Sequence, residues 1–493
     1  MIRRHQKQDY ETVSRSRKSR ATEFSVVQDR FQSRSLASEK ASIIHGEQAA
    51  DLSPVNANTS LKPGHVFSYA ALFAFTIVLY ARPAEFYPSA ITNSLALIIG
   101  IVTLACFIAT QISLEGKLTT RPSEVNLVLL FMLTALLSIP LAIDPAIAWT
   151  EFSGTFVRGI LIFIVIINVV RTPRRLKALL FLSVATAIVL SAQAMNDYRL
   201  GLMTVEGYRA AGRGTGIFGN TNDMALHLVT MLPISIAFFI GSRNLLKKII
   251  HAACAAVMIF GIVLSYSRGA FLGMIVVFLF LVLKISKRRR LEITAVVLVM
   301  ATVIILLAPT AYGTRLLSIF FPELDPGGSA DSRRGELFRS TYVALRHPLL
   351  GIGMGNYQAN MSYKGLVTHN SYTQVASEMG MLALVLYTTY IVTPLRKLGV
   401  IARETFATRE NSSFYYLALG LQASLLVFMV SSFFLSVAYG WNVYYVVGYA
   451  VCFRRIYESE TGKFVVIKKP QRQPDGAPDE APIGESAHRP AIA

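Results

Sequence analysis

Three groups of polar side chains interrupt a largely apolar sequence and could bind or activate a substrate. The first is His369, in the stretch Thr368-His369-Asn370-Ser371-Tyr372 that directly precedes an apolar run. A neutral imidazole there could take a proton from a hydroxyl group, because histidine titrates near working pH. A lone histidine is more often structural or exposed. If His369 acts as a base, the group that orients its imidazole must come from elsewhere in the chain.

The second group is Arg268, in Ser265-Tyr266-Ser267-Arg268-Gly269-Ala270 between two apolar runs. Almost no loop separates these runs, so the guanidinium must lie at or just inside the membrane interface. A charge carried to the centre of a membrane helix costs about 2.5 to 3.5 kcal/mol on insertion scales. Arg268 is therefore either a ligand for an anion or an anchor that snorkels to the interface.

The third group is Arg213 with the glycine-rich stretch after it, which leads into an apolar run through Asn220-Thr221-Asn222-Asp223. This pattern predicts a helix N-terminus capped by Asn222 or Thr221. The N–H groups of such an end and a nearby arginine both favour a phosphate. Against this reading, the glycines could simply tighten the helix entry, and Asp223 would repel an anion.

Other polar residues give weaker signals. Arg209, Arg334, Arg158 and Asn222 are secondary candidates for substrate binding, and the pair Arg82 and Glu85 could line a cavity or lie at the interface. The stretch 351–356 is rich in glycine but lacks the spacing and the preceding strand of a nucleotide loop. The acidic residues form no dense cluster and the three cysteines lie inside apolar runs. Neither a metal site nor a disulfide framework is predicted.

The elements that position these residues are membrane helices. Of the 493 residues, 53% are hydrophobic and 16% charged, and the mean hydropathy is +0.47, which excludes an ordinary soluble domain. Runs of about 17 to 25 apolar residues predict about twelve spans, near 66–81, 90–112, 124–143, 155–170, 176–195, 222–240, 248–266, 269–284, 291–308, 371–393, 414–437 and 441–453. We therefore expect an all-α, polytopic membrane protein.

Basic residues gather in alternate loops, and these loops are expected to face the cytoplasm together with both ends of the chain. The longest polar segment, 309–370, is then a large extracytoplasmic loop. Residues 1–64 and 454–493 read as disordered cytoplasmic tails around a membrane domain over 65–453. The net charge of +19 is explained by attraction to an anionic leaflet, without nucleic acid.

The apolar run after His369 should begin a helix at Ser371, because Ser371 and Gln374 match an S-x-x-Q capping box. Glu378 follows farther along that helix, roughly 13 Å from His369 by helical rise. It cannot orient the imidazole directly unless the chain bends.

Taken in order, these motifs resemble the O-antigen ligase and polymerase superfamily. The likeness covers about residues 120–450 and rests on the order and spacing of Arg213-x-x-Gly-x-x-Gly-Asn-x-Asn, Ser267-Arg268-Gly269, Arg334-Gly-Glu-Leu-Phe-Arg, His347-Pro348-Leu349-Leu350-Gly351-Ile352-Gly353, and His369-Asn370-Ser371-Tyr372 with Glu378-Met379-Gly380. The long basic N-terminal tail departs from the family pattern, as does Phe338, where many relatives carry Trp.

The resemblance implies a multi-pass glycosyltransferase of the bacterial inner membrane, similar to the C-type glycosyltransferases, with its active face extracytoplasmic. It implies inverting transfer of a glycan from a polyprenyl-diphosphate carrier to an acceptor hydroxyl, without a metal or another cofactor. His369 would then be the base, Arg213 and Arg268 would hold the donor diphosphate, and Arg334 would help to place either substrate.

The acceptor remains open at this stage. A ligase, which we place first, uses lipid A-core; a polymerase uses another lipid-linked repeat; an oligosaccharyltransferase uses Ser or Thr of a protein. A flippase or other transporter of lipid-linked glycans is the alternative outside this family. Against it stand the large one-sided loop, the absence of evident repeats and the scarcity of acidic residues within the spans.

Overall fold

The computed structural model describes residues 61, 64–203, 209–210, 218–284, 310–318, 321, 323, 328–409 and 414–467. Regular secondary structure in these ranges is helical throughout, which confirms the all-α prediction. The described residues all belong to one compact unit, Ser60–Ala493.

Nine helical segments in the described ranges are long and apolar enough to cross a membrane, and each overlaps a predicted span, so the polytopic membrane fold is confirmed. They are Val66–Phe86 (α2 Val66–Ala81 and α3 Pro83–Phe86), Ala90–Glu115 (α4), Ser123–Leu141 (α5 Ser123–Ser138 and η1 Ile139–Leu141), Pro145–Val169 (α6 Pro145–Glu151, η2 Phe152–Phe156 and α7 Val157–Val169), Pro173–Arg199 (α8), Thr221–Gly241 (α9), Leu245–Ser265 (α10), Ser371–Glu404 (α15) and Phe414–Phe434 (α16 Phe414–Ser431 and η6 Ser432–Phe434).

Three predicted spans remain. The run 291–308 lies outside the described residues. The run 269–284 forms α11 (Arg268–Lys284), which is 17 residues long. The run 441–453 forms the first part of α17 (Trp441–Thr461), in which residues 443–453 are all buried. Helix α17 is thus an interior helix of the bundle, and it continues beyond the apolar run that predicted it.

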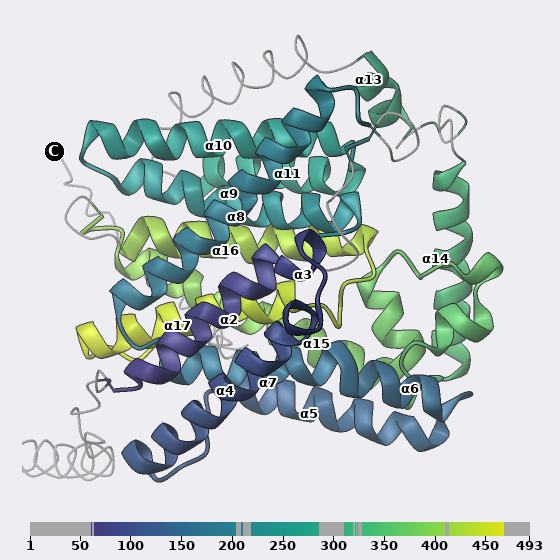
Figure 1. The fold of residues 1–493 in the computed structure, drawn as a ribbon, viewed down its shortest axis with the longest axis horizontal. Coiled ribbons are helices and arrows are strands. Elements are labelled where there is room, and N and C mark those ends of the chain that lie inside the picture. The colour runs from purple at the N-terminus through teal and green to yellow at the C-terminus, as the bar shows by residue number, and fades with distance from the viewer. Residues whose placement is uncertain are drawn as a thin grey trace, which may run out of the picture. The chain divides into compact units, whose positions relative to one another are not determined.

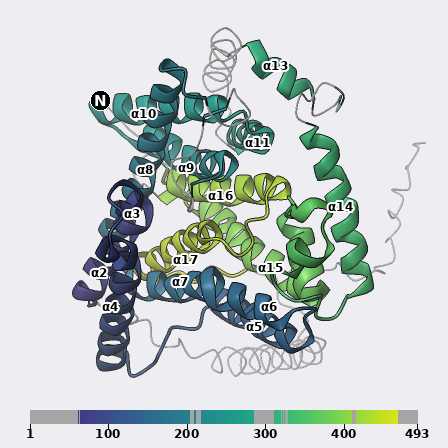
Figure 2. The same ribbon diagram turned by 45° about the vertical axis from the view of Figure 1, so that its right-hand side comes forward.

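Inside the bundle, α9 and α16 pack closely through small side chains. The Ser424 hydroxyl donates to the carbonyl of Thr230 at 2.7 Å. A Cβ added at Gly420 would lie 2.6 Å from the Cβ of Ala237. Small residues at such contacts let membrane helices approach each other. In Figure 2 the interior helices α15, α16 and α17 lie between the layer of α2 and α4 and helix α14.

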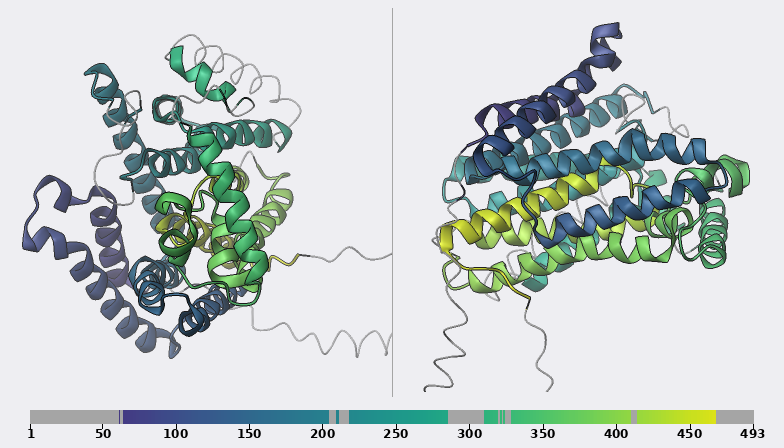
Figure 3. Two further views of the ribbon diagram at one scale, coloured as in Figure 1. Left: turned by 90° about the vertical axis from the view of Figure 1, so that its right-hand side faces the viewer. Right: turned by 90° about the horizontal axis from the view of Figure 1, so that it is seen from below.

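The long predicted loop is largely helical where it is described, with α13 (Thr310–Leu317), α14 (Ser329–Arg346), η4 (Tyr357–Met361) and η5 (Tyr363–Gly365). Helix α14 crosses one end of the bundle at an angle to the long helices (Figure 1), and it stands in front when that end faces the viewer (Figure 3, left). The Ser340 hydroxyl joins it to α15 by donating to Thr373 Oγ1 at 2.9 Å. The loop therefore covers the N-terminal end of α15.

Candidate active site

Helix α15 begins at Ser371, as predicted, and leaves His369 just outside it. Its cap is Asn370, whose Oδ1 accepts hydrogen bonds from the backbone N–H groups of Tyr372 and Thr373 at 2.9 and 3.0 Å. The predicted S-x-x-Q capping box is wrong, because the short Asn side chain one position earlier already satisfies two of the N–H groups at the helix start.

The residues on both sides of His369 are tied to the segment that precedes α17. The Ser371 hydroxyl donates to the carbonyl of Leu435 at 2.6 Å and accepts from the N–H of Val437 at 3.0 Å. Thr368 and Ser436 share a hydrogen bond of 2.7 Å between their hydroxyls. The position of His369 is therefore set by two loops that are distant in the sequence.

His369 itself has an uncommon conformation and an altered acidity. Its φ of 52° lies in the left-handed region, which non-glycine residues rarely adopt and which is found often at functional sites. Burial, and to a lesser extent the Arg333 guanidinium on α14, lower the pKa of His369 from 6.5 to about 4. The half-buried imidazole is therefore neutral at pH 7 and can accept a proton.

Near its start, α15 is interrupted at Gly380, where φ is 87° and ψ is 175°. The segment before it in the chain supplies hydrogen bonds at this break. The N–H of Gly353 donates to the carbonyl of Glu378 at 2.8 Å, and the N–H of Met381 donates to the carbonyl of Pro348, also at 2.8 Å. The loop 348–353 thus replaces helix bonds that the break removes, which satisfies buried backbone groups.

Only glycine fits on either side of this contact. A Cβ at Gly351 would lie 2.3 Å from the carbonyl carbon of Glu378, and a Cβ at Gly380 would lie 2.2 Å from the carbonyl oxygen of Leu349. Both glycines also have positive φ, at 65° and 87°. The glycine-rich stretch therefore packs against a membrane helix, in agreement with the rejection of a nucleotide loop.

Glu378 lies two residues before this break. The residue is only 3% exposed, and its carboxylate accepts a hydrogen bond from the Tyr439 hydroxyl at 2.8 Å. Backbone N–H groups of Gly355 and Tyr357 also bind it. Burial and the Glu378 carboxylate raise the pKa of Tyr439 well above its ordinary value, so the phenol keeps the proton that it donates.

A second polar centre forms where α9 begins and α10 ends. The buried Arg209 donates through Nε to the carbonyl of Ser265 at 3.0 Å and through Nη2 to Asn222 Oδ1 at 2.9 Å. Arg268 starts α11 only three positions after Ser265 and is 9% exposed. Three of the predicted residues, Arg209, Asn222 and Arg268, thus come from separate segments into one region.

The cap of α9 differs from the prediction. The helix begins at Thr221, and its N-cap is Asn220, whose Oδ1 accepts from the N–H of Asn222 at 2.8 Å. The predictions of Asn222 or Thr221 as the cap are wrong, because Asn222 lies inside the helix and uses its side chain to accept from Arg209. Arg213 lies outside the described residues.

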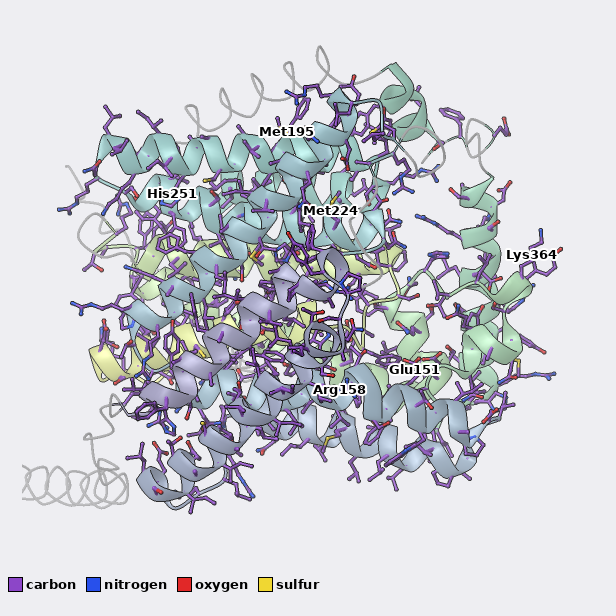
Figure 4. The ribbon with its side chains drawn as sticks, viewed as in Figure 1. Glu151, Arg158, Met195, Met224, His251 and Lys364 are labelled. Atoms are coloured by element: carbon purple, nitrogen blue, oxygen red, sulfur yellow. The ribbon has the colours of Figure 1, made fainter. Side chains whose placement is uncertain are left out.

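A cavity of about 660 Å³ opens at the end of the bundle that α14 covers. It lies between the region of His369 and Glu378 and the region of Arg209 and Asn222, and residues next to both regions line it. Figure 4 shows Glu151, one of its lining residues, and places Lys364 of η5 at the outer edge near α14. The polar and aromatic lining consists of Arg82, Thr92, Asn93, Glu151, Thr155, Asp223, Tyr357, Gln358, Thr368, Gln374, Glu378, Ser436, Tyr439, Trp441 and Asn442.

The cavity contacts each centre through a neighbour of a predicted residue. Thr368 precedes His369, and Asp223 follows Asn222, whereas neither His369 nor Arg268 is part of the lining. The sequence does not single out Glu151, Tyr439 and Trp441, because these residues lie in or beside apolar runs and give no local signal. Among the described residues, no group of three or more His, Cys, Asp or Glu side chains could hold a metal ion.

One family comparison matches this part of the chain. Residues 253–388 match a family model described as O-antigen ligase. This match supports the resemblance of the chain to the O-antigen ligase and polymerase superfamily. A comparison with curated proteins gives no match. The matched segment contains Arg268, α14, the loop 348–353, His369 and Glu378, so it includes the base candidate, one arginine candidate and the helix break.

The remaining candidates lie at the margins of the cavity or away from it. Arg334, on α14, is exposed and lies over the ring of Phe338, 5.8 Å from its centroid. Arg158 is exposed on α7, outside the matched segment. Arg82 pairs with Glu85 at 2.9 Å and lines the cavity. Of these arginines, Arg82 alone is part of the cavity lining.

Proposed function

We propose that this protein transfers a glycan from a polyprenyl-diphosphate carrier to an acceptor hydroxyl at the extracytoplasmic face of the inner membrane, as an O-antigen ligase that uses lipid A-core. The family match supports glycan transfer of the O-antigen ligase or polymerase type. The observation that carries the assignment of the site is the neutral, half-buried His369 beside a polar cavity large enough for sugar residues.

In the proposed reaction, His369 takes the proton of the acceptor hydroxyl while its oxygen attacks the anomeric carbon. The bond between that carbon and the phosphate oxygen breaks, and the polyprenyl diphosphate leaves with the bonding electrons. Attack from the face opposite the leaving group inverts the anomeric configuration. Tyr439 and Glu378 lie in the cavity wall, where their hydrogen bond can orient sugar hydroxyls.

Arginines stabilise the leaving diphosphate in this proposal. Arg268 is buried beside the Arg209 and Asn222 centre, and Arg213 precedes the same helix start in the sequence. Guanidinium groups bind phosphate oxygens in a two-pronged manner and stabilise charge that develops in the transition state. Transfer is therefore expected to continue in EDTA.

Glycan profiling of a deletion strain tests the function, because each alternative leaves a different species behind. If the protein is a ligase, its loss leaves bare lipid A-core, and finished glycan accumulates on the carrier. Loss of a polymerase leaves lipid A-core with single repeats, and loss of a protein oligosaccharyltransferase leaves lipopolysaccharide intact. Either of the last two results would replace the ligase assignment.

The orientation can be tested independently with reporter fusions. A fusion at Gly328 should report the extracytoplasmic side, whereas fusions at Lys287 and Arg403 should report the cytoplasm, as the loop charges predict. A cytoplasmic signal from Gly328 would contradict the placement of the site.

A further inference from the structure

Two further cavities lie at the other end of α15, far along the helix from His369. A cavity of about 700 Å³ is lined there by Lys284, Arg396, Gly399, Val400, Arg403, Glu404, Gln422, Val466 and Ile467. A smaller cavity of about 210 Å³ shares Lys284, Gly399, Arg403 and Gln422 with it. The proposed transfer reaction uses neither cavity.

The lining of the larger cavity carries a clear excess of positive charge. Lys284 comes from the end of α11, and Arg396 and Arg403 come from α15. The one carboxylate in the lining, Glu404, already accepts a hydrogen bond from the Tyr457 hydroxyl at 2.9 Å. The positive-inside rule explains basic residues at this end of the helices. It does not require that three of them surround one cavity.

Gln422, which lines both cavities, adds a hydrogen-bond acceptor to this group. It is 9% exposed, and its Nε2 donates to the carbonyl of Leu395 at 3.1 Å. Its buried Oε1 has no hydrogen-bond partner among the described residues. Gly399 leaves room for this arrangement, since a Cβ there would lie 2.7 Å from Nε2. A buried acceptor without a donor is costly, so a ligand hydroxyl would fit this place.

Apolar side chains complete the cavities. Val400, Val466 and Ile467 line the larger one, and Phe406 and Leu419 line the smaller one. A site that combines cations, a buried acceptor and apolar walls at the predicted cytoplasmic interface suits an amphiphile better than a free ion. Basic pockets between membrane helices on that side are known to bind anionic lipid headgroups.

We propose that these joined cavities bind an anionic phospholipid with a hydroxylated headgroup, of the phosphatidylglycerol type. The lipid phosphate lies among Lys284, Arg396 and Arg403, and a headgroup hydroxyl donates to Gln422 Oε1. A zwitterionic lipid fits less well, because its ammonium group would add a fourth cation to the same lining.

Native mass spectrometry of the full-length protein in detergent, titrated with defined lipids, tests this site. The wild type should retain phosphatidylglycerol in preference to phosphatidylcholine. The double variant Arg396→Gln/Arg403→Gln should bind phosphatidylglycerol about 25-fold more weakly, at about fivefold for each basic residue. Arg174→Gln, which removes an exposed arginine at the start of α8, should bind like the wild type. Equal binding by the double variant and the wild type would overturn the site.

Two further measurements test the ligand chemistry. Gln422→Leu should weaken phosphatidylglycerol binding while leaving phosphatidic acid, which has no headgroup hydroxyl, nearly unchanged. Equal loss of both lipids would contradict the hydroxyl contact. Inorganic phosphate should not displace the lipid at matched concentration, and displacement would identify a site for free phosphate instead. Because the readout is lipid binding, the result is independent of the proposed glycan transfer.

Discussion

Two buried glutamates have different partners: Glu124 on α5 pairs with the C-terminal part of α15, whereas Glu378 lies in the first turns of α15. Glu124 is 0% exposed and pairs with Lys397 at 3.0 Å and with Arg454 at 3.1 Å. Glu378 is 3% exposed, yet its side-chain partner is the neutral Tyr439 at 2.8 Å. The first carboxylate is enclosed by cations from two helices, whereas the second lies in the wall of a cavity.

This difference in partners indicates different roles for the two glutamates. A buried carboxylate with two cationic partners joins α5, α15 and α17 and leaves little capacity to bind anything else. A carboxylate held by a phenol and backbone N–H groups keeps lone pairs directed at a cavity. Substitutions at the Glu124 end should therefore change stability, and substitutions around the Glu378 end should change transfer.

The largest effect is expected from Arg268. Arg268→Ala should lower transfer by about 10³-fold or more, the scale at which an arginine stabilises a transferring phosphate group. Arg268→Lys should restore little, because a single ammonium cannot replace the planar guanidinium fork. Transfer by purified enzyme measures both, with the exposed Arg243→Ala as the control. If the Arg268 and Arg243 variants were equally active, Arg268 would be an interfacial anchor.

At the other end, Glu124→Ala should destabilise the protein by about 3 kcal/mol, because it leaves two buried cations without their shared partner. Thermal melting in detergent reports this change. Glu460→Ala, at an exposed position on α17, should melt like the wild type. Glu378→Gln should also melt almost normally, since its amide oxygen still accepts from Tyr439. If Glu378→Gln lost more stability than Glu124→Ala, the distinction between the two ends would be wrong.

His369→Ala should lower transfer by about 10²-fold or more, the usual contribution of a general base. Donor binding and the amount of protein in the membrane should stay normal, because the cap of α15 is Asn370 and not His369. In cells the lipid-linked donor should accumulate. If the variant transferred glycan at nearly the normal rate, the assignment of His369 as the base would be wrong, and its role would be structural.

The sequence predicted the elements better than their contacts. Among the described residues, nine of the about twelve spans predicted from apolar runs are confirmed, as is the start of α15 at Ser371. Such runs are readable because lipid demands long apolar helices whatever their neighbours are. The sequence did not predict the contact between the segments of Gly351 and Gly380, because nothing in the pattern around either glycine indicates its partner. The helix caps were misplaced by one or two residues, because several Asn, Ser and Thr side chains compete at each helix start.

The cavity could not be predicted for a similar reason. Its wall combines Arg82 after α2, Glu151 in α6, Asp223 in α9 and Tyr439 before α17. These residues share no spacing in the sequence, and only the packing of the helices brings them together. His369 could be singled out as a candidate because a histidine directly before an apolar run is itself a local signal, whereas Tyr439 and Trp441 lie among other aromatic residues.

The smallest expected effect concerns the acidity of His369. Only the neutral imidazole can act as the base, so wild-type transfer should be nearly constant around neutral pH and fall as the pH drops through about 4. Arg333→Gln removes a cation that disfavours the protonated form, so it should raise the pKa of His369. Burial is the larger cause and remains, so the pKa should stay below 6.5.

The pH profile of transfer measures this shift, with the acid limb moving to higher pH in Arg333→Gln. Arg346→Gln, at an exposed arginine in the last turn of the same helix, should leave the limb in place. Because the control also removes a positive charge from α14, a change in net charge alone would move both profiles equally. An acid limb that moved with both variants, or with neither, would show that Arg333 does not act on the base and that another group sets the profile.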